Sequence, residues 1–102
     1  MECTELTQIE LPATIDNIGV GAFCNCVKLE RIKFPSDLKS VPSYLFQGCR
    51  ALQFVYLPDS VDSIGDKAFC YCEKLERVAT SKGLKNIRIG SDVFYGCGKL
   101  IR

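Results

Sequence analysis

Residues 52–74 read LQFVYLPDSVDSIGDKAFCYCEK, and this stretch recurs along the chain with a fixed period. Leu52 has equivalents 23 residues away in both directions, at Leu29 and Leu75. The proline, the second phenylalanine and the second cysteine of the stretch repeat in the same register, although the last unit is 25 residues long. Chance rarely holds four residue types in one register, so the chain is built from internal repeats. The equivalent positions are Leu6, Leu29, Leu52, Leu75 and Leu100; Pro12, Pro35 and Pro58; Phe23, Phe46, Phe69 and Phe94; and Cys3, Cys26, Cys49, Cys72 and Cys97.

The apolar period changes twice within each unit. Residues 29–34 end in alternating apolar positions and are closed by Pro35, which predicts a short strand. Residues 61–65 predict a second extended piece that ends in a glycine turn. Residues 66–72 carry apolar groups at short-helix spacing, which predicts a turn of α or 3-10 helix.

One unit cannot enclose its own apolar positions, but stacked units can cover one another. We therefore expect one repeat array over residues 1–102, with equivalent residues roughly 4.8 Å apart from rung to rung. Two extra residues in the fourth unit, around residues 87–89, predict a bulge or a longer strand. The expected units span about residues 6–28, 29–51, 52–74 and 75–99, with partial units at both ends.

The repeat resembles the leucine-rich repeat family of BspA type. The resemblance is carried by the period, by the steps Leu11-Pro12 and Leu57-Pro58, and by residues 18–23 and 64–69. It implies a leucine-rich-repeat solenoid, a β-rich right-handed superhelix with a parallel concave sheet and with short strands and helical or 3-10 turns on the other side. It also implies a cell-surface or secreted protein that binds a protein ligand, extracellular-matrix proteins among them, or mediates adhesion. The family has no shared catalytic site to transfer.

Composition excludes several other classes of function. The 102 residues include 13 basic and 12 acidic side chains, and the net charge of +1 gives no electrostatic case for binding nucleic acid. The chain has no histidine, the commonest acid–base group, so we predict no enzyme activity and no cofactor. No apolar run approaches the ~18 residues of a membrane span, and residues 1–5 do not resemble the start of a signal peptide.

Outward-facing strand residues are the positions that a partner of such an array can reach. Phe54 and Tyr56 alternate along a predicted strand and should point to one exposed face. Arg31 and Arg77 should flank Phe54 one rung away on either side, within reach of guanidinium–ring stacking. Aromatic residues and arginine dominate interface hot spots, so these four residues form the predicted partner-binding patch. Ordinary cross-strand packing on a solvated sheet face is the alternative explanation.

The cysteines predict a buried ladder of thiols. Cysteine is small and among the most frequently buried residues, and five of the seven recur at one position of the unit. Stacked equivalents point the same way, so we expect free thiols. The additional Cys24 and Cys70 create two pairs that lie roughly 10 Å apart, too far for one zinc ion. We therefore predict no metal site, and without histidine no catalytic cysteine.

Two functional hypotheses remain open. The first is a non-catalytic protein-binding or adhesion module, part of a larger surface protein, that uses the concave strand face. The second is a structural spacer array with no ligand of its own. A thiol redox or metal protein is a third class, and it would show reactive cysteines. Neither end carries a polar capping unit, which also predicts weak end-to-end self-association through open strand edges.

Overall fold

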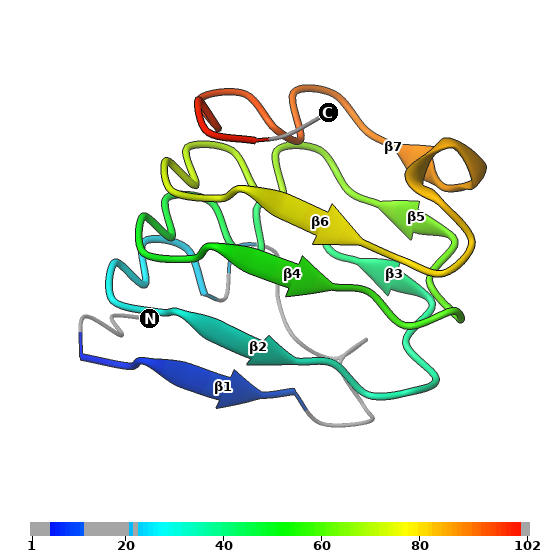
Figure 1. Ribbon diagram of the computed structural model, residues 1–102, viewed down its shortest axis with the longest axis horizontal. Helices are drawn as coiled ribbons and strands as arrows, with labels where there is room; N and C mark the ends of the chain where they lie inside the picture. The colour runs from blue at the N-terminus through cyan, green and yellow to red at the C-terminus, as the bar shows by residue number, and fades with distance from the viewer. Residues whose placement is uncertain (1–4, 12–20, 22, 101–102) are drawn as a thin grey trace.

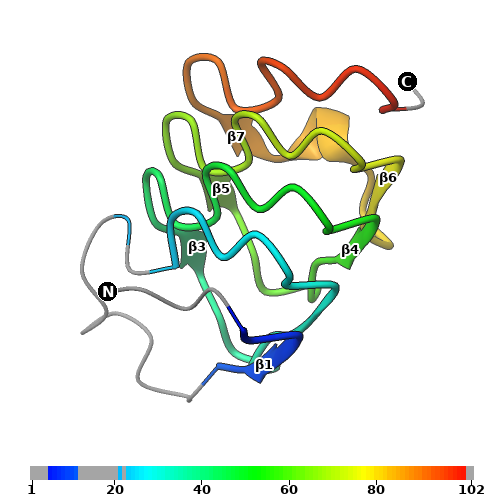
Figure 2. The ribbon, with the colours of Figure 1, turned by 90° about the vertical axis from the view of Figure 1, so that its left-hand side faces the viewer.

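The computed structural model describes residues 5–11, 21 and 23–100. Short strands follow one another up two sides of a stack, as Figures 1 and 2 show. We name these the front layer, which is the predicted concave sheet, and the rear layer. The front layer contains β1 (Gln8–Glu10), β2 (Arg31–Lys33), β4 (Phe54–Tyr56) and β6 (Arg77–Ala79). The rear layer contains β3 (Ser40–Val41), β5 (Ser63–Ile64) and β7 (Arg88–Ile89), and the 3-10 helix η2 (Leu84–Asn86) precedes β7.

All the described strand pairs are parallel, and the repeat sets their register. Ile9 is aligned with Ile32 between β1 and β2, an offset of 23 residues. The same offset separates Val55 on β4 from Val78 on β6. In the rear layer β5 pairs with both β3 and β7, and the offset to β7 is 25 residues. One sequence period is therefore one rung, which confirms the predicted solenoid.

Stacked phenylalanines run through the interior in the predicted order. Phe46 lies parallel to Phe23 and to Phe69, with ring centroids 5.9 and 5.6 Å apart. Phe94 continues the file at 6.1 Å from Phe69. Aromatic pairs of this kind contribute about 0.5–1.5 kcal/mol beyond the area that they bury. The leucine that opens each unit is completely buried beside this file at Leu29, Leu52 and Leu75.

The corner at residues 66–72 is a run of turns, so the predicted turn of α or 3-10 helix is wrong. Its N–H groups alternate in direction. The N–H of Cys70 donates to the oxygen of Lys67 within the corner, whereas the N–H of Phe69 donates to the oxygen of Val93 in the next unit. A helix would send every N–H back along its own axis. A left-handed φ of 56° at Lys67 interrupts that course and lets the neighbouring unit accept half of the donors.

The fourth unit absorbs its two extra residues in helix η2. Strand β7 has only two residues, so the predicted bulge or longer strand at residues 87–89 is wrong. A 3-10 turn placed before the strand leaves the ladder undisturbed, because Ile64 is still aligned with Ile89.

The repeated cysteines form a buried ladder, as predicted. The Cys49 thiol donates to the main-chain oxygen of Phe23, one unit back, at 3.4 Å. Burial raises the pKa of the Cys49 thiol to about 12 and also raises that of Cys72. Cys26 is disulfide-bonded, which makes the expectation of free thiols wrong at that position. Cys3 lies outside the described residues.

The front layer is interrupted between β2 and β4. β1 pairs with β2 and β4 pairs with β6, but no strand pairing or hydrogen bond joins β2 to β4 in the described chain. A bulkier side chain accompanies this break. Phe34 follows β2 at the position that Leu57 occupies after β4, and its ring packs edge-on against Phe46 at 6.1 Å. The predicted parallel sheet is thus present as two separate ladders.

Candidate functional site

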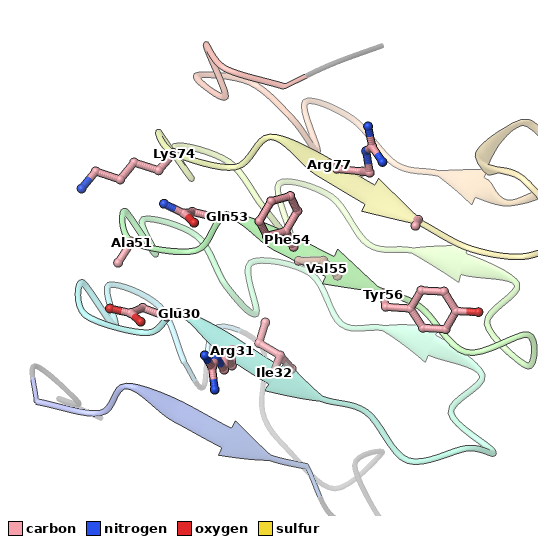
Figure 3. Close-up of a pocket in the computed structure, with 11 residues that line it drawn as sticks. Glu30, Arg31, Ile32, Ala51, Gln53, Phe54, Val55, Tyr56, Lys74 and Arg77 are labelled. Carbon is pink, nitrogen blue, oxygen red and sulfur yellow. The ribbon is translucent and has the colours of Figure 1, made fainter.

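Strand β4 presents two aromatic rings to solvent in the middle of the front layer. Phe54 is 60% exposed and Tyr56 is 64% exposed, while Val55 between them is buried in the core. This alternation follows from the two-residue period of a strand that has one buried face. Figure 3 shows both rings projecting from β4, well apart from each other. Their predicted exposure is confirmed.

Two exposed arginines lie on the strands at either side of Phe54. Arg77 is its direct neighbour in the β4–β6 register, and Arg31 occupies the equivalent position on β2, across the break. Both arginines therefore flank Phe54 one rung away, as predicted, although neither guanidinium stacks on its ring in the described part of the chain. The cation–π contact found there joins Lys67 to Tyr44, at 5.9 Å from the ring centroid.

A cavity of about 650 Å³ opens over the break between β2 and β4 (Figure 3). Its size falls within the range of about 300–1,000 Å³ that is usual for ligand pockets. All four residues of the predicted patch line it, so the structure brings them to one place. The remaining lining residues are Glu30, Ile32, Ala51, Gln53, Val55, Lys74 and Ala79.

The cavity is lined by three cations and one carboxylate. Arg31, Lys74 and Arg77 line it together with Glu30, and none of the three cations forms an ion pair within the described residues. Lys33 on the same layer differs, because its ammonium lies 3.7 Å from a carboxylate oxygen of Glu10. The positive charge at the cavity is therefore available to a partner.

Sequence reasoning missed Lys74, because it considered only the strand positions. Lys74 directly precedes Leu75, at the bend that leads into β6, and it is one of the residues that line the cavity. Ala51 occupies the equivalent position one unit earlier and also lines the cavity. Both Lys74 and Ala51 could have been predicted by including the residue that precedes the opening leucine of each unit among the candidate positions.

A second group of exposed aromatic side chains lies on the corner turns. Tyr44, Tyr71 and Tyr95 are all exposed, and the rings of Tyr71 and Tyr95 meet edge-to-face with centroids 5.5 Å apart. Tyr44 and Tyr71 adopt left-handed backbone conformations, with φ of 63° and 61°. These positions were not predicted, because aromatic residues rarely adopt that conformation and their sequence gives no signal of it.

Other kinds of site were sought among the described residues. No group of three or more cysteine, aspartate or glutamate side chains there could hold a metal ion. No helix in that part of the chain has the length and apolar character needed to cross a bilayer.

Short parallel strands in register, with internal ladders of leucine, phenylalanine and cysteine, define a leucine-rich-repeat solenoid. Within that class the chain belongs to the BspA type leucine rich repeat family, whose sequence profile matches residues 1–102 in six copies. Repeat proteins of this class are in general non-catalytic modules for protein interaction.

Two solved structures share this fold. A leucine rich cell surface protein from Faecalibacterium prausnitzii superimposes with a TM-score of 0.83 at 34% identity, over 94% of this chain and 25% of that one. A leucine-rich repeat protein from Bacteroides ovatus superimposes with a TM-score of 0.80 at 24% identity, over 95% of this chain and 24% of that one. The chain thus spans about a quarter of the length of either protein. No curated protein matches it.

Proposed function

We propose that the chain is a non-catalytic protein-binding module whose contact surface is the front layer around β4. The observation that carries this proposal is the pair of exposed rings, Phe54 and Tyr56, beside a cavity at the centre of the layer. Exposed aromatics beside arginine are the residue types that dominate interface hot spots. Arg31 and Arg77 complete the patch at its two sides.

Family membership supports the same proposal at a coarser level. The Faecalibacterium prausnitzii relative is described as a cell surface protein, and we infer a surface or secreted location for this chain by analogy. Adhesion to an extracellular-matrix protein is the finer form of this proposal. Weak self-association through strand edges is a separate expectation, which light scattering across a concentration series tests.

Selection of ligands from a random peptide library displayed on phage tests the proposal. The bait is the folded chain, and enriched clones are then assayed against the double variant Phe54→Ser/Tyr56→Ser. Both side chains are exposed, so the double variant should keep the circular dichroism spectrum and melting temperature of the parent. We expect it to lose binding to most of the enriched clones.

A matched control variant separates the front layer from other exposed aromatics. Tyr95→Ser removes an exposed ring from a corner turn and should leave the enriched clones bound. Clones that bind the double variant as well as the parent would refute the proposed surface. A selection that enriches nothing would favour the alternative, a spacer array with no ligand of its own.

A further inference from the structure

The break in the front layer leaves main-chain groups turned toward each other without hydrogen bonds. In a parallel ladder, alternate residues direct their N–H and C=O groups to alternate neighbours. The N–H of Arg31 donates to Thr7 on the β1 side, so the groups of Ile32 turn toward β4. By the same register, the groups of Phe54 and Tyr56 turn toward β2. β2 and β4 remain neighbours across the break, so these groups face each other and do not form an open sheet edge.

The positive charges around this break favour peptides that carry acidic side chains. Three cations that form no ion pair with any described residue line the cavity with one carboxylate, whereas the whole chain carries a net charge of only +1. Arg31 and Arg77 lie on opposite sides of β4, at equivalent positions of their units. Guanidinium groups bind carboxylates through two parallel hydrogen bonds, which a lysine ammonium or a neutral partner cannot reproduce.

The rings between the arginines supply apolar contact area. Phe54 projects from the central strand, and Tyr56 adds a hydroxyl that can donate or accept beside its ring. A ligand that matches both features has acidic groups separated by an apolar one. Building on the proposed binding function, we propose that the cavity recognises an extended acidic peptide segment, with carboxylates at Arg31 and Arg77 and an apolar side chain on Phe54.

The same cations could attract an acidic polysaccharide. The exposed Phe54 ring favours a peptide, because it offers an apolar surface to a side chain that stands between two acidic ones.

Two synthetic peptides of equal length test the preference for acidic groups. The first alternates glutamate with phenylalanine, and the second replaces every glutamate with glutamine. Fluorescence anisotropy should show the glutamate peptide binding about tenfold more tightly or better, because hydrogen bonds to charged groups are stronger than neutral ones. Its affinity should fall as salt is raised, since the cations are exposed.

Variants assign the preference to the two arginines. Arg31→Gln and Arg77→Gln should each weaken binding of the glutamate peptide by about tenfold and so reduce its advantage over the glutamine peptide. Arg88→Gln is the matched control, because Arg88 is exposed on β7 in the rear layer and does not line the cavity. That variant should bind both peptides as the parent does.

The outcomes separate this inference from the binding function on which it rests. Equal binding of the two peptides, sensitive to Phe54→Ser, would overturn the acidic preference and leave the aromatic surface as the binding site. Binding of heparin without binding of either peptide would overturn the peptide partner. An equal effect of Arg88→Gln would overturn the assignment to the cavity, and absence of binding to all three probes would overturn the inference as a whole.

Discussion

The Sγ atom of Cys72 donates a 3.3 Å hydrogen bond to the main-chain oxygen of Phe46, one unit earlier in the chain. The next cysteine of the ladder, Cys97, makes the same bond to Phe69 at 3.1 Å. A thiol is a small apolar group with a weak donor, so it fills the interior and also donates a second hydrogen bond to a carbonyl that already accepts from the main chain of its own turn. This relation explains why one position of the unit repeats cysteine rather than alanine or serine.

Burial of the ladder predicts loss of stability in alkali. The pKa of the Cys49 thiol rises from 9.0 to about 12 in the folded chain, because burial disfavours the thiolate. The unfolded chain therefore releases this proton in the interval from about pH 9 to about pH 12 while the folded chain keeps it. The free energy of unfolding must fall as pH rises through that interval. Urea denaturation at a series of pH values measures the slope.

Cys49→Ala provides the control for this slope. Other groups also titrate in alkali, but only the parent carries the Cys49 contribution. The variant should therefore show a shallower fall of unfolding free energy with pH. Identical slopes in parent and variant would contradict the prediction.

Close approach of two units predicts that Gly65 does not tolerate a side chain. A Cβ atom added at Gly65 would lie 2.5 Å from the main-chain nitrogen of Ser43 and 2.8 Å from its Cα. Backbone cannot move aside without separating the rungs, so Gly65→Ala should lower the free energy of unfolding by about 1–3 kcal/mol. Gly98→Ala is the matched control, because its Cβ would meet nothing within 4 Å. A comparable loss in both variants would contradict the steric explanation.

Replacing a buried hydroxyl predicts a gain in stability. Thr80 stands where Leu57 stands in the preceding unit, and among the described side chains its Oγ1 is buried without a hydrogen-bond partner. Thr80→Val keeps the shape and removes the unpaired group, so the free energy of unfolding should rise by about 1–2 kcal/mol. The exposed Thr7 serves as the control, since Thr7→Val should have little effect. A decrease at Thr80 would show that the hydroxyl is satisfied in solution.

The break between β2 and β4 predicts an alternating pattern of amide exchange. The main-chain N–H of Val55 faces β6 and belongs to an intact ladder, whereas the N–H groups of Phe54 and Tyr56 face the break. Amide hydrogen exchange followed by NMR should therefore be slower at Val55 than at its two neighbours. Phe34→Leu restores the side chain found after β4, and we expect it to slow exchange at Phe54 and Tyr56. Equal protection of all three amides in the parent chain would contradict the break.

Periodic features of the fold could be predicted from the sequence, and irregular ones could not. The period at Leu52 predicted the register of every described strand pair, because stacking repeats whatever one unit does. The left-handed conformation of Lys67 gave no signal, since glycine is the residue that usually marks such a position. The break beside Phe34 also escaped notice, because it depends on how one enlarged side chain packs across units.

The site divides in the same way. Exposure of Phe54 and Tyr56 followed from strand alternation, which needs no knowledge of the neighbouring units. The contribution of Lys74 depends on how a bend lies beside the next rung, and the orientation of the Arg31 and Arg77 side chains depends on rotamers. Periodicity alone could not determine either feature.

Because the N–H donors of the corner alternate in direction, the array is sensitive to whether an odd or an even number of residues is inserted there. Around residues 66–72, each N–H directed along the stack is followed by one directed within its own turn. One inserted residue would exchange these two roles for every amide after it, whereas the extra pair in the fourth unit lies outside the corner, at helix η2. Such a molecule can be lengthened by whole units or varied at its loops, whereas a single residue inserted in the corner would disrupt the hydrogen bonds between units.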